Sequence, residues 1–107
     1  GHRLPLQFGK ANTSLKRLML AHNSISYLPD DVSGLTALRV LDITANKLTR
    51  LPKGEKGIQN WHSIARITLK DNRLATLGDG IAGWTSLLEL DITGNQVLSL
   101  PEGLGKM

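Results

Sequence analysis

One nine-residue phrase occurs four times in this chain: an aliphatic residue, two variable positions, an aliphatic residue, one variable position, an aliphatic residue, two variable positions and an asparagine. The copies occupy residues 15–23, 38–46, 64–72 and 87–95. Their closing asparagines recur at intervals of 23, 26 and 23 residues. A fixed period of roughly 20–50 residues indicates a repeat architecture in which each repeat packs against its neighbours. The chain is therefore predicted to be a solenoid, which presents a broad surface instead of a closed pocket.

A second apolar pattern follows each asparagine. After Asn46 it consists of Leu48, Leu51, Pro52, Ile58 and Trp61, and the other segments carry matching residues at most of these positions. Over residues 15–107 the two halves together resemble the leucine-rich repeat family, most closely its 23-residue class LxxLxLxxNxLxxLPxxLxxL. Similar repeats occur in Scribble-like scaffolds, Roco proteins and plant intracellular Ras-group-related proteins.

Four repeats are predicted in one domain, at 15–37, 38–63, 64–86 and 87–107. In residues 1–14, Gly1-His2 resembles the remainder of a purification tag, and Leu4, Pro5 and Phe8 match the second half of an earlier repeat. We therefore expect a fragment of a longer array. The 26-residue interval holds the segment Lys53–Gly57, whose glycines and charges predict a mobile loop away from the sheet.

Each repeat is expected to hold one short strand and one helical turn, which gives an α/β fold. Alternating apolar residues with the period of a strand cover 18–20, 41–43, 67–69 and 90–92. Stacking would align them as a parallel sheet on the concave face, with right-handed crossovers. Apolar pairs three residues apart predict a turn of α- or 3₁₀-helix, with loops, on the convex face: Val32/Leu35, Ile58/Trp61 and Ile81/Trp84.

Two residue types are assigned structural roles. A buried amide at a strand end can satisfy backbone groups of its own and the adjacent repeat, which is the role predicted for Asn23, Asn46, Asn72 and Asn95. Trp61 and Trp84 occupy the repeat position of Leu35, so we expect them to pack in the core instead of stacking on a ligand.

The outward strand positions form four columns across the repeats. The columns are Lys16, Arg39, Ala65 and Leu88; Arg17, Val40, Arg66 and Glu89; Met19, Asp42, Thr68 and Asp91; and Ala21, Thr44, Lys70 and Thr93. A protein partner is predicted to bind here, on Lys16, Arg17, Met19, Arg39, Asp42, Thr44, Arg66, Thr68, Lys70, Glu89 and Asp91. The five cations would make one end of this surface positive and the three acids would make the rest negative, which orients a partner. The alternative is that these charges only keep an open sheet face soluble.

Composition excludes several other classes. The chain has no cysteine, so a disulfide framework, a thiolate metal site and a cysteine nucleophile are absent. Because secreted members of the resembled family usually have cysteine-paired caps, this favours the cytoplasm. No apolar run is long enough to cross a membrane. The net charge is +4, but acids are interleaved with the cations and aromatics are few, so nucleic-acid binding is not expected.

No residue pattern favours an enzyme, a cofactor or a metal site. Asp42 and Asp91 share a column at about 9–10 Å, two strand spacings, which is close to the carboxylate separation of an inverting glycosidase. Nothing in the pattern encloses either acid to raise its pKa, as such chemistry requires. His2, His22 and His62 lack the spacing that brings two ligands onto one metal.

The sequence therefore predicts a non-catalytic protein-interaction module, a scaffold or regulatory domain of a larger protein. The family resemblance implies a partner such as a small GTPase, a phosphatase or a cytoskeletal protein, and no residue chooses among them. The alternative is a structural segment that associates with flanking repeats or identical copies through its open ends, because exposed strand edges invite pairing.

Overall fold

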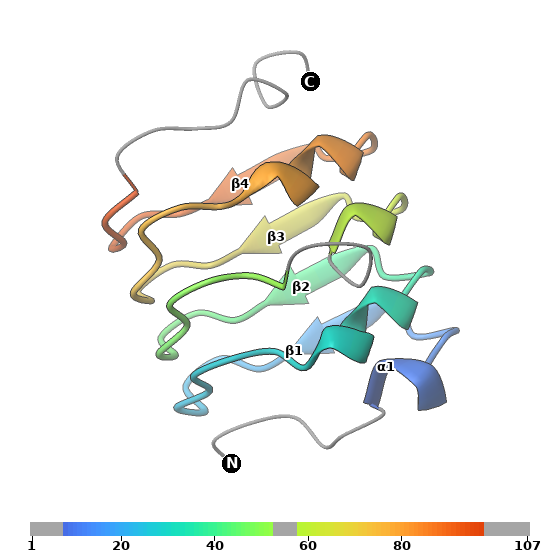
Figure 1. Ribbon diagram of the computed structural model, residues 1–107, viewed down its shortest axis with the longest axis horizontal. Coiled ribbons are helices and arrows are strands. Elements are labelled where there is room, and N and C mark those ends of the chain that lie inside the picture. The colour runs from blue at the N-terminus through green and yellow to red at the C-terminus, as the bar shows by residue number, and fades with distance from the viewer. Residues whose placement is uncertain (1–7, 53–57, 98–107) are drawn as a thin grey trace.

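The alternation of apolar side chains produces a parallel sheet. The computed structural model describes residues 8–52 and 58–97 (Figure 1). Its strands are β1 (Arg17–Met19), β2 (Val40–Asp42), β3 (Arg66–Thr68) and β4 (Glu89–Asp91). They lie side by side in the order β1-β2-β3-β4, and each neighbouring pair is parallel. In every strand the central residue is more buried than the first, as the two-residue period requires.

The strands begin one residue earlier than the apolar pattern predicted. The hydrogen-bond ladder explains the difference, because it already begins at Lys16, whose carbonyl accepts the Arg39 N–H at 2.8 Å. It also continues past the strand ends, where the Leu20 N–H donates to the Asp42 carbonyl at 2.7 Å. Side-chain alternation identifies the positions that face the core, whereas main-chain pairing sets the strand limits.

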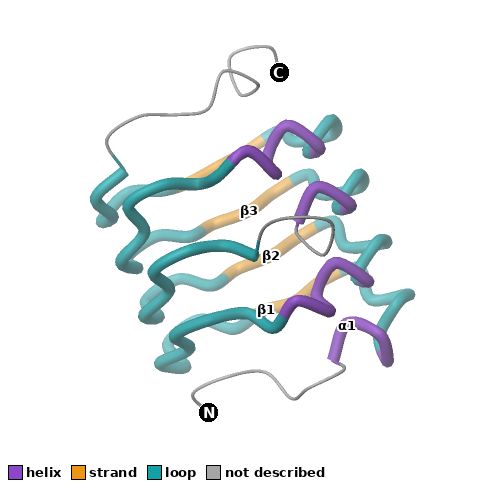
Figure 2. Tube along the Cα trace, viewed as in Figure 1, coloured by secondary structure: helices purple, strands orange, loops and turns teal. Residues whose placement is uncertain are grey.

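A row of short helical turns lies on the opposite side of the sheet (Figure 2). These turns are the α-helical turn α1 (Phe8–Ala11) and the 3₁₀ turns η1 (Asp30–Gly34), η3 (Ile58–Asn60) and η4 (Asp79–Gly83). Each predicted apolar pair closes a 3₁₀ hydrogen bond, such as the Leu35 N–H to the Val32 carbonyl at 3.0 Å. The predicted helical turn is confirmed at all three of these apolar pairs.

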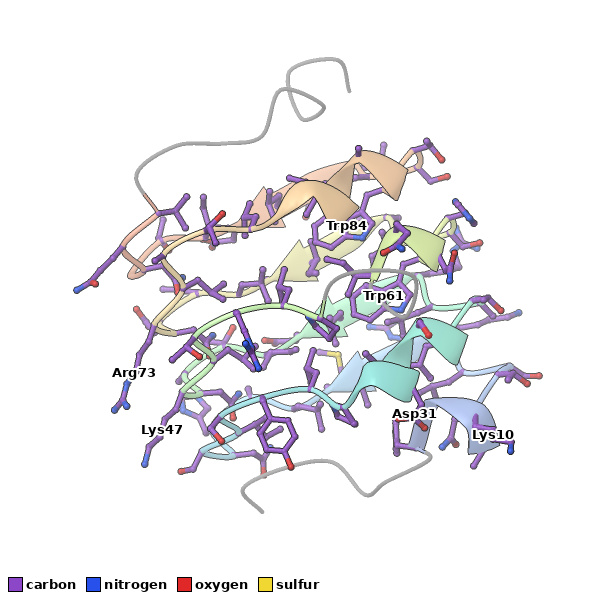
Figure 3. The ribbon with its side chains drawn as sticks, in the orientation of Figure 1. Lys10, Asp31, Lys47, Trp61, Arg73 and Trp84 are labelled. Carbon is purple, nitrogen blue, oxygen red and sulfur yellow. The ribbon has the colours of Figure 1, made fainter. Side chains whose placement is uncertain are left out.

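One continuous apolar core fills the space between the sheet and the helical turns. Trp61 and Trp84 are 1% and 0% exposed, which confirms their predicted place in the core. Their rings stack with centroids 6.3 Å apart and planes at 9° (Figure 3). Each indole also donates to a carbonyl of the preceding repeat, from Trp61 Nε1 to Val32 at 2.8 Å and from Trp84 Nε1 to Ile58 at 3.1 Å. The tryptophans therefore join adjacent repeats as well as filling the core.

The helical turns pack closely enough to require glycine. A Cβ atom at Gly83 would overlap the main-chain carbonyl of Gln59, and one at Gly9 would overlap that of Asp31. Neither carbonyl can move as a flexible side chain does. These two glycines set the approach of η4 to η3 and of α1 to η1.

The segments outside the described residues include the predicted loop Lys53–Gly57, the suggested tag and residues 98–107 of the last repeat. The division into repeats at 15–37, 38–63, 64–86 and 87–107 therefore stays a prediction.

Candidate functional site

The outward-facing residues of the four strands form one surface, which we call the sheet face. Strand pairing aligns Arg17, Val40, Arg66 and Glu89 in one column and Met19, Asp42, Thr68 and Asp91 in the next. Flanking main-chain bonds align the outer columns, as in the Ala65 N–H to Arg39 carbonyl bond and the Ala45 N–H to Lys70 carbonyl bond, both 2.8 Å. The structure thus has the four columns that the repeat spacing predicted.

Asn46 shows how the chain is fixed where it leaves the sheet. Its side chain is almost fully buried, at 7% exposure. Its Oδ1 accepts the N–H groups of Asn23 and Ile25 at 3.0 and 2.9 Å. Its Nδ2 donates to the Leu20 carbonyl of the preceding repeat at 2.8 Å and to the Ile43 carbonyl of its own repeat at 3.1 Å. The amide therefore satisfies main-chain groups that two repeats share.

The later asparagines repeat this geometry. Asn72 Nδ2 donates to the Ile43 carbonyl at 2.8 Å, and Asn95 Nδ2 donates to the Leu69 carbonyl at 2.8 Å, each across a repeat boundary. Asn23 differs from the prediction, because it is half-buried and, among the described residues, its Nδ2 donates to the Ala21 carbonyl of its own repeat, at 3.0 Å. These amides are occupied by the main chain, which separates them from the residues available to a partner.

Positive charge gathers where the first three strands begin. A shallow groove of about 420 Å³ lies there, and we call it the basic groove. It is lined by Lys16, Arg17, Arg39, Val40, Ala65, Arg66 and Leu88. Leu88 is the most exposed of the large apolar side chains described, at 77%. The groove thus combines four cations with an apolar wall.

A second groove lies beside the first and is acidic. It has a volume of about 300 Å³, and we call it the acidic groove. It is lined by Met19, Val40, Leu41, Asp42, Arg66, Ile67, Thr68, Glu89, Leu90 and Asp91. Arg66 borders both grooves, and its Nε lies 3.8 Å from Glu89 Oε2. Both side chains are largely exposed, so this ion pair contributes about 0–1 kcal/mol.

The aspartates of the acidic groove are held by their own strand ends. Asp91 Oδ1 accepts the Thr93 N–H at 3.0 Å and the Thr93 hydroxyl at 2.7 Å. These two bonds, with a smaller effect of Lys70, lower the pKa of the Asp91 carboxyl. Asp42 Oδ1 similarly accepts the Thr44 N–H at 2.9 Å. A general acid needs a raised pKa, so the environment of Asp91 does not suit that role.

Lys70 lies apart from the other four cations. The sequence grouped it with Lys16, Arg17, Arg39 and Arg66, but it follows β3 whereas Arg66 begins it. Lys70 does not line the basic groove, and its charge acts on Asp91. The position of a cation along its strand therefore determines whether it lines the basic groove.

The remaining predicted contact residues lie near the acidic groove. Thr68 and Met19 line it, and Met19 is 56% exposed. Thr44 lies in the adjoining column, with its hydroxyl 3.4 Å from that of Thr68. Leu88 was not among the contact residues predicted from the sequence. Its place in the same column as Lys16 and Arg39 is the signal that could have identified it.

Within residues 8–52 and 58–97, no cluster of three or more histidine, aspartate or glutamate side chains could hold a metal ion. In the same part of the chain, no helix has the length and apolar character needed to cross a membrane.

Comparisons with known proteins identify the repeats. Leucine-rich repeat family models match residues 2–48 and 86–107. The curated protein sequences gave no match. Among solved structures, a leucine-rich repeat protein of Leptospira interrogans matches with a TM-score of 0.86 and 33% sequence identity. The match covers 94% of this chain and 25% of that protein, so the chain spans about a quarter of its length.

Domains of this kind generally serve protein interactions and are typically non-catalytic. The repeated sequence phrase, the parallel strands with 3₁₀ turns and the matching solved structure lead to one conclusion: the chain is a leucine-rich repeat protein.

Proposed function

We propose that this chain binds a protein partner on its sheet face, as a scaffold or regulatory domain of a larger protein. The observation that carries the proposal is the composition of that face. Two adjoining grooves hold exposed cations, acids and two large exposed apolar side chains, Met19 and Leu88, above a sheet whose inner-strand residues Leu41 and Ile67 are buried.

The dimensions of the face suit a segment of protein. Four strands spaced about 4.8 Å apart spread their columns over roughly 15 Å, which is comparable to the diameter of one helix or to a few residues of extended chain. The separate basic and acidic grooves would orient such a segment and accelerate its encounter with the face. A small GTPase, a phosphatase or a cytoskeletal protein remains a partner suggested by the family alone.

Selection from a phage-displayed library of random dodecapeptides tests the proposal. The selected peptides should lose at least about tenfold in affinity for a variant carrying Arg17→Glu, Arg39→Glu and Arg66→Glu, because opposite charges are replaced by like charges. All three side chains are exposed, so the melting temperature of the variant should stay close to that of the parent.

A matched control makes the same charge change elsewhere. Lys10, Lys47 and Arg73 are exposed and project from the edges of the solenoid, away from the strands (Figure 3). Peptides selected on the parent protein should still bind the Lys10→Glu, Lys47→Glu, Arg73→Glu variant. Loss of binding in this control together with retention in the first variant would refute the sheet face as the binding site.

Self-association is the second candidate, and burial at the outer strands favours it. Leu18 of β1 and Leu90 of β4 are partly buried, whereas Leu41 and Ile67 in the inner strands are 1% and 2% exposed. Another copy stacked on either outer strand would cover this apolar area. Sedimentation velocity over a wide concentration range tests the idea, and a constant monomeric value would remove it.

A further inference from the structure

We propose that the basic groove binds an acidic segment of a protein, with neighbouring carboxylates at Lys16, Arg17 and Arg39 and one large apolar side chain against Leu88. This inference rests on the proposed function and narrows it, because it names the chemistry of the bound segment and its place on the sheet face.

The three cations are available to carboxylates. Lys16, Arg17 and Arg39 are exposed, and the 2.8 Å bond from the Arg39 N–H to the Lys16 carbonyl brings β1 and β2 together at this point. Among the described residues, the ion pair within 4 Å joins Arg66 to Glu89 and involves none of these three. Two guanidinium groups and an ammonium therefore face solvent without a carboxylate, and arginine binds carboxylates in a two-pronged geometry.

Leu88 gives the groove an apolar end. At 77% exposure it stands out from the sheet, and it also lines a neighbouring hollow of about 310 Å³ together with Arg39, Ser63, Ala65 and Ser86. A single exposed leucine is ordinary on a protein surface. Here, however, it closes a groove whose other wall is cationic, so an apolar side chain that follows a carboxylate pair can leave water by packing on it.

Strand spacing sets the sequence of the bound segment. Lys16, Arg39, Ala65 and Leu88 form one column across four strands, as the chain of bonds from the Arg39, Ala65 and Leu88 N–H groups shows. Three strand spacings amount to about 14 Å, which an extended chain at about 3.3 Å per residue crosses in roughly four residues. The expected pattern is two adjacent acidic residues, three small or polar residues and then a leucine, isoleucine or phenylalanine.

A longer polyanion fits this surface less well. The acidic groove adjoins the basic one, and Arg66 at their border is already paired with Glu89. A nucleic acid carries charge along its whole length, so a strand continuing past Arg66 would meet Glu89, Asp91 and Asp42. A peptide confines its negative charge to two residues and meets the cations alone.

Fluorescence polarisation with labelled synthetic peptides tests the inference. The probe is a fluorescein-labelled peptide with an Asp-Glu pair, three glycine or serine residues and a leucine. One comparison peptide has serine in place of the leucine, and another has Asn-Gln in place of the acidic pair. We expect the probe to bind with a dissociation constant below about 1 mM and each comparison peptide to bind at least about fivefold more weakly.

Substitutions in the protein should mirror those in the peptide. Arg39→Glu should weaken probe binding at least about tenfold, and increasing salt should weaken the binding of the parent protein. Leu88→Ala should weaken binding of the probe about fivefold. It should not change binding of the comparison peptide that has serine in place of leucine, because the side chain of Leu88 is expected to contact the leucine of the probe. Met19→Ala is the matched control, since Met19 is also exposed but lines the acidic groove.

Several results would overturn the inference. One is an absence of probe binding up to about 1 mM protein, and another is equal binding of the probe and the peptide with serine in place of leucine. A third is an effect of Met19→Ala on probe binding as large as that of Leu88→Ala. A fourth is binding of a labelled oligouridylate that is tighter than binding of the probe. Phage-selected peptides without acidic residues that still depend on the sheet face would refute this inference while supporting the proposed function. Selected peptides that ignore the sheet face would refute the proposed function itself.

Discussion

Replacing Asn46 with alanine should be among the most destabilising single changes in this protein. The substitution removes both acceptor bonds and all the donor bonds of one buried amide. The loss is not the sum of these bonds, because some of the main-chain partners keep other hydrogen bonds. The expected magnitude therefore depends on which groups are left without a partner.

The surviving bonds can be followed group by group. The Ile43 carbonyl still accepts Asn72 Nδ2 at 2.8 Å, and the Thr44 carbonyl still accepts the His22 N–H at 2.9 Å. The groups deprived of Asn46 are the N–H groups of Asn23 and Ile25 and the carbonyl of Leu20.

The bond to Ile25 is buried and the other two are partly buried. A fully buried unsatisfied group costs about 1–3 kcal/mol and partly exposed groups cost less, so Asn46→Ala should lower the free energy of unfolding by about 2–4 kcal/mol. Asn95→Ala should cost about half as much, because the bonds of its amide are partly buried or exposed.

Urea denaturation followed by tryptophan fluorescence measures this loss, because both indoles are buried in the folded protein. Lys47→Ala is the control: this neighbouring side chain is exposed, and its removal should change stability by less than about 0.5 kcal/mol. If Asn46→Ala lost no more stability than Lys47→Ala, the amide would not be sealing main-chain groups between the repeats, and the reasoning would be wrong.

Three further predictions concern the helical turns and the acidic groove. Trp61→Phe should cost about 1–3 kcal/mol in urea denaturation, because it leaves a buried main-chain carbonyl without its indole donor; a change below 0.5 kcal/mol would contradict this. Gly83→Ala should lower the melting temperature by several degrees, since its methyl group would overlap the carbonyl of Gln59, and an unchanged melting temperature would refute that contact. Thr93→Val should raise the pKa of Asp91 towards its ordinary value in an NMR titration, because one donor is lost. Since the folded-state pKa is lowered, the stabilising effect of Asp91 should be present above its unfolded-state pKa and be lost as pH falls through the folded-state pKa.

The regular parts of the fold could be predicted because the same apolar residues show both the repeat length and the buried positions. Leucine and isoleucine recur at positions where a repeat needs apolar side chains, so the spacing alone located the core, the helical turns and the columns of the sheet face. Trp61 and Trp84 occupy the repeat position that Leu35 holds in the first repeat. Because that position carries a large apolar residue in each case, the pattern also predicted that both tryptophans are buried.

The asparagine bonds to the main chain were predicted, but the main-chain contacts of the tryptophans and glycines could not be. The indole donors of Trp61 and Trp84 reach carbonyls of the preceding repeat, which depends on the distance between helical turns and not on residue type. The close approach at Gly9 and Gly83 depends on the same distance. On the sheet face, the sequence placed Lys70 in the correct column but grouped it with the four cations of the basic groove, because that grouping considered charge and not position along the strand.

The joining of adjacent repeats at two separate places has a consequence for recognition. The amides of Asn46, Asn72 and Asn95 span repeat boundaries beside the sheet, and the indoles of Trp61 and Trp84 span them on the opposite side. A change in the tilt between neighbouring repeats would break either the asparagine bonds beside the sheet or the indole bonds on the opposite side. The main chain beneath the two grooves is therefore held at a fixed spacing, so binding of the proposed segment would cost less conformational entropy and the strands could not move apart for a segment of another length.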